Sequence, residues 1–300
     1  MPLCADCIGL ELETAVVPIE ARGLLAYAAA LGFDSDPRFM DDARPEGLEA
    51  VPFICTRFEW QLQSELRRHP ALGLSQGEMD RGVHFIQDSR FFKPIRPGMN
   101  LQARGRVSEI RTVRSGSLIA YDYTIEDTDA CEKLSASRSI SIFRDVAIAP
   151  DGYRAQEQQR SAGQAPSRVA SHTPSLTESL RVAIPVTRGF PHVYTECAQI
   201  WNPVHTERQV ALAAGLPDII LHGTATWALA GRELLIAHGC EGWRINRLAG
   251  RFVGHVIPPA TLILRYRPND QEPASIHFDV LGANGVVVLA DGLAEFTEET

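Results

Sequence analysis

The stretch that decides the fold reads YTECAQIWNPVHTERQVA over residues 194–211 and LPDIILHGTATWALA over residues 216–230. Asn202 and Pro203 predict a helix start, because Asn accepts a hydrogen bond from a first-turn N–H and Pro suits the first helical position. A helix that begins at Pro203 places His205 in its first turn, where the positive end of the helix dipole disfavours the imidazolium. We therefore expect His205 to be a neutral ring that can accept a proton.

A second helix start follows at LHGT, residues Leu221–Thr224. Because Gly223 has no Cβ, a substrate oxygen can approach the free N–H groups at the start of this helix. Those N–H groups polarise a carbonyl, while His205 supplies a base. The combination predicts proton chemistry beside a thioester or a ketone.

Asn202–His205, with Glu207 two residues later, resembles the motif of the (R)-specific enoyl-CoA hydratases, also called MaoC-like dehydratases. That motif reads Tyr, a short gap, Gly-Asp-x-Asn-Pro-Ile/Leu-His and then an acidic residue. The Asp of the family falls on Ile200 in this chain, or on Gln199 after a shift of one residue. In the family, the Asp and the His together activate the water that adds across an enoyl double bond. The resemblance therefore implies the fold and the pocket, and the replaced Asp leaves the reaction open.

The resemblance also suggests roles for the residues around His205. Gln199 is expected to hold water, since an amide both donates and accepts hydrogen bonds, and Glu196 on a predicted strand is an alternative carboxylate. Asn202 belongs to the same catalytic group. The expected substrate-binding residues are Tyr194 and Trp201 as pocket walls and His222 packed beneath the pocket.

Arg244, Arg247 and Arg251 form a local basic cluster, which predicts contacts with the phosphates of coenzyme A. The resemblance also implies that coenzyme A binds on this side of the second repeat. Lys93 and Arg96 are the weaker alternative for the phosphate contacts. The six cysteines lack the spacing of a disulfide scaffold or a zinc site, so we expect free thiols and no metal.

The chain has 300 residues and a formal net charge of −8. Nucleic acids and anionic membranes require clustered excess Lys and Arg, so we expect neither as a partner. No apolar run reaches the length of a membrane span, no secretory signal opens the chain, and the last three residues are not a peroxisomal address. We expect a cytoplasmic protein.

Residues 161–179 are rich in Ser, Pro, Gly and Thr, which is typical of a linker between a first repeat over 1–160 and a second over 180–300. In the first repeat, helical spacing of apolar residues predicts a helix, and alternation of apolar and polar residues predicts antiparallel strands. These are the helix Ile19–Leu31 and the strands Leu101–Val107, Leu118–Glu126 and Ser135–Phe143.

The second repeat follows the same logic. The helix Thr224–Ile236 is apolar on most faces, which favours a helix wrapped by a curved sheet. The expected strands are Leu180–Val186, Arg251–His255, Leu262–Tyr266, Ser275–Leu281 and Val286–Phe296. The fold class is α+β, and the resemblance makes it a double hotdog, in which each of two tandem repeats is a curved antiparallel sheet around a central helix.

Softer resemblance to the same family extends into the first repeat at Glu20–Gly32, Val51–Phe53, His84–Gln87 and Lys93–Ile95. In members with two repeats, the first repeat has lost the catalytic motif and opens space for the acyl chain. We therefore expect a degenerate first repeat and an active second one.

The expected reaction is the reversible hydration of a trans-2-enoyl thioester, or the dehydration of an (R)-3-hydroxyacyl thioester, of coenzyme A or acyl carrier protein. No metal or redox cofactor is expected, because the thioester already acidifies its α-position. The alternatives are a hotdog enzyme of different thioester chemistry (an isomerase, eliminase or cyclase) and a non-catalytic acyl-thioester-binding subunit. The expected assembly is a homodimer or a pairing with another hotdog subunit.

Overall fold

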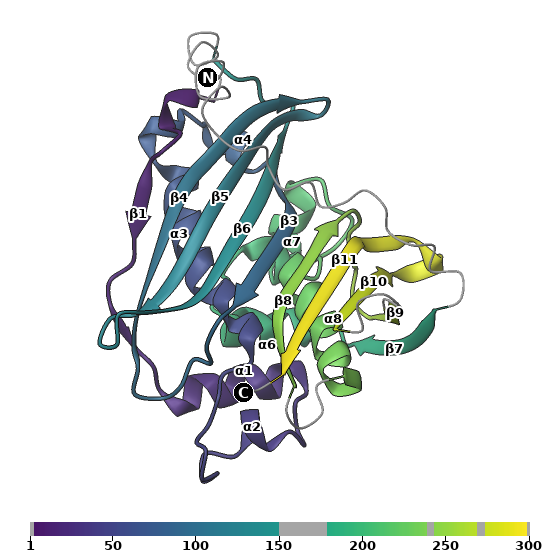
Figure 1. The fold of residues 1–300 in the computed structure, drawn as a ribbon. Coiled ribbons are helices and arrows are strands. Elements are labelled where there is room, and N and C mark those ends of the chain that lie inside the picture. Colours follow the sequence, from purple (N-terminus) through teal and green to yellow (C-terminus); the bar gives the residue numbers. More distant parts are fainter. Residues whose placement is uncertain (1–2, 150–178, 239–242, 269–273, 299–300) are drawn as a thin grey trace.

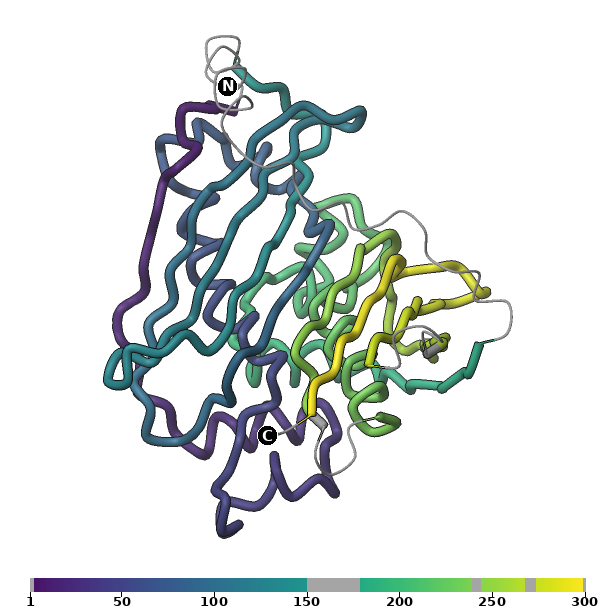
Figure 2. Tube along the Cα trace, in the orientation of Figure 1, coloured from purple at the N-terminus to yellow at the C-terminus, as the bar shows by residue number. Residues whose placement is uncertain are grey.

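The computed structural model describes residues 3–149, 179–238, 243–268 and 274–298. An N-terminal half, purple to teal, stands beside a C-terminal half, green to yellow (Figures 1 and 2). The N-terminal half contains β1 (Glu11–Glu13), β2 (Val17–Pro18), α1 (Ala21–Leu31), α2 (Pro37–Met40), α3 (Cys55–Arg68), α4 (Gln76–Met79), β3 (Gly82–Phe91), β4 (Asn100–Val113), β5 (Gly116–Asp127) and β6 (Glu132–Arg144). The C-terminal half contains β7 (Leu180–Val186), α6 (Phe190–Ala198), α7 (Arg208–Ala213), α8 (Gly223–His238), β8 (Trp243–Phe252), β9 (Ala260–Pro268), β10 (Ser275–Leu281) and β11 (Val287–Glu298).

The described strands form one 11-stranded sheet in the order β1-β4-β5-β6-β3-β8-β11-β10-β9-β7, with β2 also paired to β4. Outward from the β3–β8 pair, the strands of the two halves follow the same order. The order β3, β6, β5, β4 corresponds to β8, β11, β10, β9, and β1 and β2 pair with β4 as β7 pairs with β9. The described residues therefore contain two repeats of one arrangement related by an approximate two-fold axis.

Each half places one long helix against its own strands. α3 contacts β4 and β5, and α8 contacts β8 and β11. In α3 the residues Phe58, Leu62 and Leu66 are spaced by four and are buried, so one helical face packs on the sheet. The helix ends before Pro70, because the residue that precedes a proline avoids helical backbone angles.

The two halves share a continuous apolar core. The rings of Phe53 and Trp227 meet edge to face with centroids 5.4 Å apart, which joins the turn before α3 to α8. Gly231 allows this approach, because a Cβ there would lie 2.5 Å from Phe53 and 2.6 Å from Leu248. Both rings are fully buried, and burial of such side chains contributes about 2 kcal/mol or more each.

Two local predictions are wrong. No long helix begins at Pro203: a 3-10 turn spans Pro203–His205, the Asn202 side chain makes no capping hydrogen bond, and α7 begins only at Arg208. Glu196 lies on the helix α6 rather than on a strand. The 3-10 turn stops because Thr206 has extended φ (−127°), which breaks the helical run.

Other element predictions need shifted limits. The strand predicted at Arg251–His255 is the end of β8, which starts at Trp243. The predicted linker lies outside the described residues apart from Ser179, so the division at residues 160 and 180 stays a prediction. Among the described helices, none is both long and apolar enough to cross a membrane.

Candidate active site

A cleft of about 910 Å³ lies between the two halves, where α3 ends and α8 begins. The C-terminal half lines it with the loop of residues 200–205 and with His222 and Gly223, and the N-terminal half with α3 and the start of β3. The predicted site residues that line the cleft are Ile200, Trp201, Asn202, His205, His222 and Gly223. The predicted residues that lie outside its wall are Tyr194, Gln199, Arg244, Arg247 and Arg251.

His205 is held by one hydrogen bond that determines its tautomer. Its Nδ1 lies 2.8 Å from the carbonyl oxygen of Ile220, and since a carbonyl only accepts, Nδ1 carries the proton. Burial lowers the pKa of His205 from 6.5 to about 4, the hydrogen bond to Ile220 opposes this shift, and His255 adds to it. The ring is therefore neutral at pH 7, with the lone pair on Nε2. Because no long helix starts here, burial rather than a helix dipole is the cause.

His222 packs directly beneath His205. The two rings stack with centroids 3.7 Å apart, and the side chain of His222 is only 1% exposed. Its Nε2 lies 3.1 Å from Oγ1 of Thr195 and 3.3 Å from the carbonyl oxygen of Ile200. Burial, and then the neighbouring His205, hold the pKa of His222 well below its usual value. A neutral, fixed His222 thus supports the ring of His205.

Tyr194 forms a further layer behind the histidines. Its ring lies 5.0 Å from that of His222 and is fully buried. Tyr194 is not among the residues that line the cleft, and its role as a pocket wall stays a prediction. Trp201 is a cleft residue as predicted and is 58% exposed, so it lies at the rim.

Gly223 is the first residue of α8, so its N–H has no partner within that helix. A Cβ at this position would lie 3.1 Å from the ring of Phe252. Glycine therefore keeps both the ring of Phe252 and the helix start in place at the wall of the cleft. Gly223 thus lies at a helix start in the cleft wall, and polarisation of a carbonyl by its N–H stays a prediction.

Of the two candidates for the position of the family's Asp, the structure places one in the cleft wall. Gln199 closes α6 in the left-handed conformation (φ 54°, ψ 37°) and is not among the residues that line the cleft, so its role in holding water stays a prediction. Ile200 is 4% exposed and lines the cleft. The position that a second acid–base group would occupy is therefore apolar here.

The three arginines predicted to bind phosphate are engaged in ion pairs. Arg244 donates to Glu49 at 2.7 and 3.0 Å, and Arg251 donates to Asp291 at 2.6 Å. Arg247 bonds Asp88 through two atoms at 2.8 Å and Glu295 at 2.9 Å. Each of these arginines on β8 is thus paired with a carboxylate, and phosphate binding by them stays a prediction.

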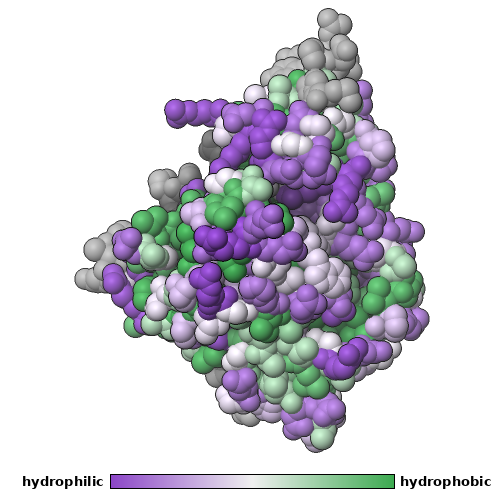
Figure 3. All heavy atoms as spheres, turned by 180° about the vertical axis from the view of Figure 1, so that it is seen from behind, coloured by the Kyte–Doolittle hydropathy of each residue, from purple (hydrophilic) through white to green (hydrophobic). Residues whose placement is uncertain are grey.

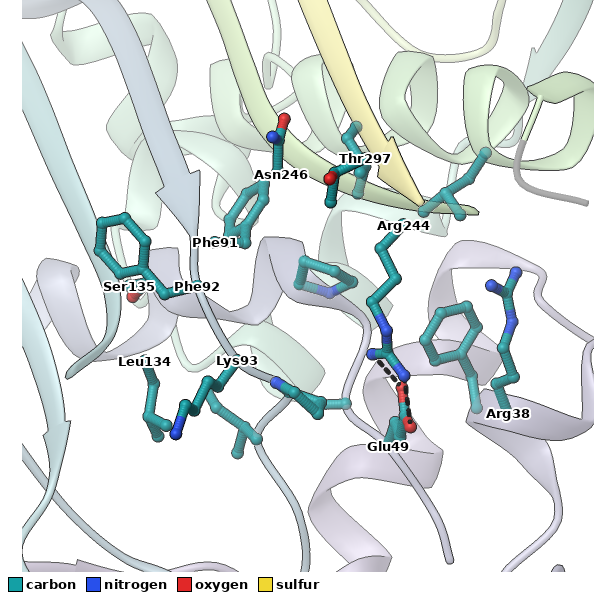
Figure 4. A pocket seen from close by; sticks show the side chains of 17 residues that line it. Arg38, Glu49, Phe91, Phe92, Lys93, Leu134, Ser135, Arg244, Asn246 and Thr297 are labelled. Carbon is teal, nitrogen blue, oxygen red and sulfur yellow. Dashed lines mark hydrogen bonds and ion pairs between the residues drawn. The ribbon is translucent and has the colours of Figure 1, made fainter. Parts of the chain in front are cut away.

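A smaller pocket of about 80 Å³ lies at the other end of α8, where α3 begins (Figure 4). Pro52 and Phe91 line it from the first half, and Leu235 and Arg244 from the second. It thus corresponds to the cleft under the approximate two-fold axis. The guanidinium of Arg244 points to Glu49 here, and no histidine of the described residues lines this pocket.

The first repeat contributes a polar wall to the cleft that was not predicted from the sequence. Glu59 is buried on α3 and accepts hydrogen bonds from Gln87 at 2.8 Å and from Ser137 at 2.5 Å. His84, named in the sequence only for its resemblance, also lines the cleft and lies 3.0 Å from Oγ of Ser139. The available signal was the serine at every second position of SASRSIS from Ser135, which places hydroxyl groups on one face of a strand.

Comparison with known proteins bears on both the fold and the site. Residues 177–280 match the family model described as a MaoC like domain. The enoyl-CoA hydratase ChsH3 of Mycobacterium tuberculosis is 22% identical over 270 residues, which covers 87% of this chain and 88% of that protein.

Solved structures agree over nearly the whole chain. A MaoC-like dehydratase from Phytophthora capsici matches with a TM-score of 0.77 at 20% identity, covering 98% of this chain and 99% of its own. Rv0216 of Mycobacterium tuberculosis, described as a double hotdog fold, matches with a TM-score of 0.62 at 14% identity, covering 98% and 96%. The predicted α+β double hotdog fold is confirmed, and the second half of the chain carries a MaoC like domain over residues 177–280.

Proposed function

We propose that the protein hydrates a trans-2-enoyl thioester of coenzyme A or acyl carrier protein, and catalyses the reverse dehydration of the (R)-3-hydroxyacyl thioester. The observation that carries the proposal is the neutral His205, whose Nδ1–H bonds Ile220 and whose Nε2 is left as a base in the cleft. The MaoC like domain and the likeness to an enoyl-CoA hydratase support the same reaction.

In the proposed reaction the thioester carbonyl accepts a hydrogen bond from the Gly223 N–H, which stabilises negative charge on that oxygen as water adds. The Nε2 of His205 takes a proton from the water while the water oxygen bonds to C3. The proton then passes to C2, so one water is consumed and a 3-hydroxyacyl thioester forms. One residue serves as base and then as acid, and the chemistry requires no metal or redox group.

The test follows the fate of water. We expect the purified chain, incubated with crotonyl-CoA in ¹⁸O-labelled water, to yield 3-hydroxybutyryl-CoA that carries the label, and chiral analysis to show the (R) form. His205→Ala should lower kcat by a factor of about 10² or more, because the proposed base is removed. His277→Ala, on β10 and away from the cleft, is the control and should retain activity.

A second candidate is a thioester reaction that needs a single base, such as isomerisation, elimination or cyclisation. The apolar Ile200 in the position of the family's Asp favours it, because the water then has one acid–base partner rather than two. Turnover of enoyl-CoA without incorporation of label would support this candidate over hydration. Binding of acyl-CoA with no turnover at all would instead indicate a binding subunit.

A further inference from the structure

The inner face of the first sheet is hydrophilic, which is unusual for a surface that faces a helix. β6 turns Ser137, Ser139 and Ser141 toward α3, and each is at most 6% exposed. Their partners on β5 are tyrosine and isoleucine, with Tyr121 opposite Ser139 and Tyr123 opposite Ser137. A tunnel for a plain fatty acyl chain would carry apolar side chains on this face, because a buried polar group without a partner is costly.

Most of these polar groups bond to one another. Glu59 is satisfied by Gln87 and Ser137, and burial raises the pKa of its carboxyl group. The hydroxyl of Ser137 also lies 2.8 Å from that of Ser89. This part of the wall is therefore self-contained, and Glu59 does not supply a counter-charge for a cation near the end of α3.

Arg67, two turns beyond Glu59 on α3, is the cation of this wall. Its Nη2 donates to Oγ of Ser141 at 2.8 Å, and its guanidinium lies 5.6 Å from the centre of the Phe143 ring. Among the described residues, its buried Nε has no hydrogen-bond partner and none of the ion pairs includes Arg67. A half-buried cation in this state is stabilised by an anion that enters the cleft.

The hydroxyl of Tyr123 is a second unused donor in the same cleft. The ring is 2% exposed, and its oxygen has no partner among the described residues. Both Tyr123 and Arg67 line the cleft. Burial raises the pKa of the Tyr123 hydroxyl, and the positive charge of Arg67 opposes that rise. Both side chains therefore belong to the polar part of the wall of one cleft.

This polar part of the wall connects with the reactive end through ring contacts. Gly223 packs on Phe252, whose ring centroid lies 4.7 Å from that of His84. The Nε2 of His84 in turn lies 3.0 Å from Oγ of Ser139. Burial lowers the pKa of His84 to about 4, and the positive charge of Arg67 adds to this shift. A thioester with its carbonyl at Gly223 can thus direct the far end of its acyl group toward Arg67.

We propose that the cleft selects enoyl thioesters whose acyl group ends in a carboxylate, and that Arg67 pairs with that carboxylate while Tyr123 donates a hydrogen bond to it. Arg67 is then a specificity-determining residue for the proposed hydration, on which this inference rests. A plain fatty acyl chain is the poorer substrate, because it leaves the buried donors unpaired.

The phosphates of coenzyme A are the other anion that could reach an arginine in this cleft. The exposed side chains of Arg68, Arg81 and Arg144 line its rim, and hydrophilic residues gather over the end of the molecule where α4 lies (Figure 3). A half-buried position among serines and tyrosines favours the acyl end for Arg67, since the coenzyme remains near solvent. The experiment therefore compares thioesters that share coenzyme A and differ only at the acyl end.

The substrates are two pairs of equal carbon number, fumaryl-CoA with crotonyl-CoA and trans-2-hexenedioyl-CoA with trans-2-hexenoyl-CoA. In at least one pair we expect the parent chain to prefer the carboxylate-ended member by about 10- to 100-fold in kcat/KM, as for a charge-assisted hydrogen bond. Arg67→Met should abolish that preference and leave the neutral member within about twofold. Arg67→Lys should keep part of the preference, and Arg68→Met, the matched control at the rim, should leave the ratio unchanged.

Equilibrium binding separates this inference from the proposed reaction. Isothermal titration with the unreactive pairs succinyl-CoA and butyryl-CoA, and adipyl-CoA and hexanoyl-CoA, should show the same preference and the same loss in Arg67→Met. Preferred binding without turnover would support the inference and overturn the hydratase. The inference would be overturned if Arg67→Met weakened the binding of both members of a pair and of free coenzyme A equally. It would also be overturned if the parent chain preferred the carboxylate-ended member in neither pair.

Discussion

At the level of single residues, the proposed chemistry depends on the protonation state of His205. A carbonyl acceptor holds Nδ1 in its protonated form, and burial beneath the cleft wall makes the charged ring unfavourable. The stacked His222 is kept neutral for the same reason, so it adds no positive charge against its neighbour. His205 is therefore in its basic form across the physiological range.

This state predicts the pH dependence of the reaction. The base is active when unprotonated, and the pKa of His205 is lowered to about 4, so kcat/KM for crotonyl-CoA should be level at neutral pH and fall only as the pH drops toward 4. The measurement is a pH profile of kcat/KM with the stability of the fold checked at each pH. An acid limb centred near the ordinary value of 6.5 would show that His205 is not the buried base described here.

At the scale of the element, the end of α6 decides which side chain faces the reaction. The left-handed backbone at Gln199 turns the chain so that Gln199 faces away and Ile200 enters the cleft wall. A motif aligned by spacing alone leaves these two positions ambiguous, because a one-residue shift exchanges them. The local backbone removes the ambiguity.

We expect Ile200→Asp to raise kcat/KM for crotonyl-CoA by about tenfold or more, since a second acid–base group then shares the water with His205. Gln199→Asp is the matched control and should not respond, because its side chain lies outside the cleft wall. Ile200→Asn introduces a side chain of the size of Asp but without the carboxylate, so it should not raise kcat/KM either. A folded Ile200→Asp that binds thioester and remains no faster than the parent would favour the single-base reactions.

At the scale of the whole molecule, β3 and β8 unite the two repeats into one sheet. Asp88 on β3 and Arg247 on β8 bond through two atoms at 2.8 Å, and Glu295 on β11 completes the group. Asp88 raises the pKa of Arg247, so the guanidinium stays charged and paired. The cleft contains residues from both repeats, so the site exists only while this junction holds.

Arg247→Met should therefore lower the free energy of unfolding by about 1–3 kcal/mol, because it leaves partly buried carboxylates unpaired. Arg251→Met is the control, since its single pair with Asp291 is more exposed and contributes about 0–1 kcal/mol. Urea denaturation measures both, and equal losses would contradict the role of the junction. A rise in KM for acyl-CoA at unchanged stability would instead support the prediction that these arginines bind phosphate.

Local patterns in the sequence predict the repeat architecture and the strands of alternating polarity, and they single out His205 and Gly223, which both line the cleft. These depend on periodicity and on short motifs, which are local properties of the chain. Only the tertiary structure showed that α3 faces a serine-lined sheet, that Tyr194 lies behind His222, and that Arg67 shares a cleft with His205. Those relations join residues far apart in sequence through strand pairing and helix packing, and burial, which sets the pKa of His205, arises only when both halves close around it.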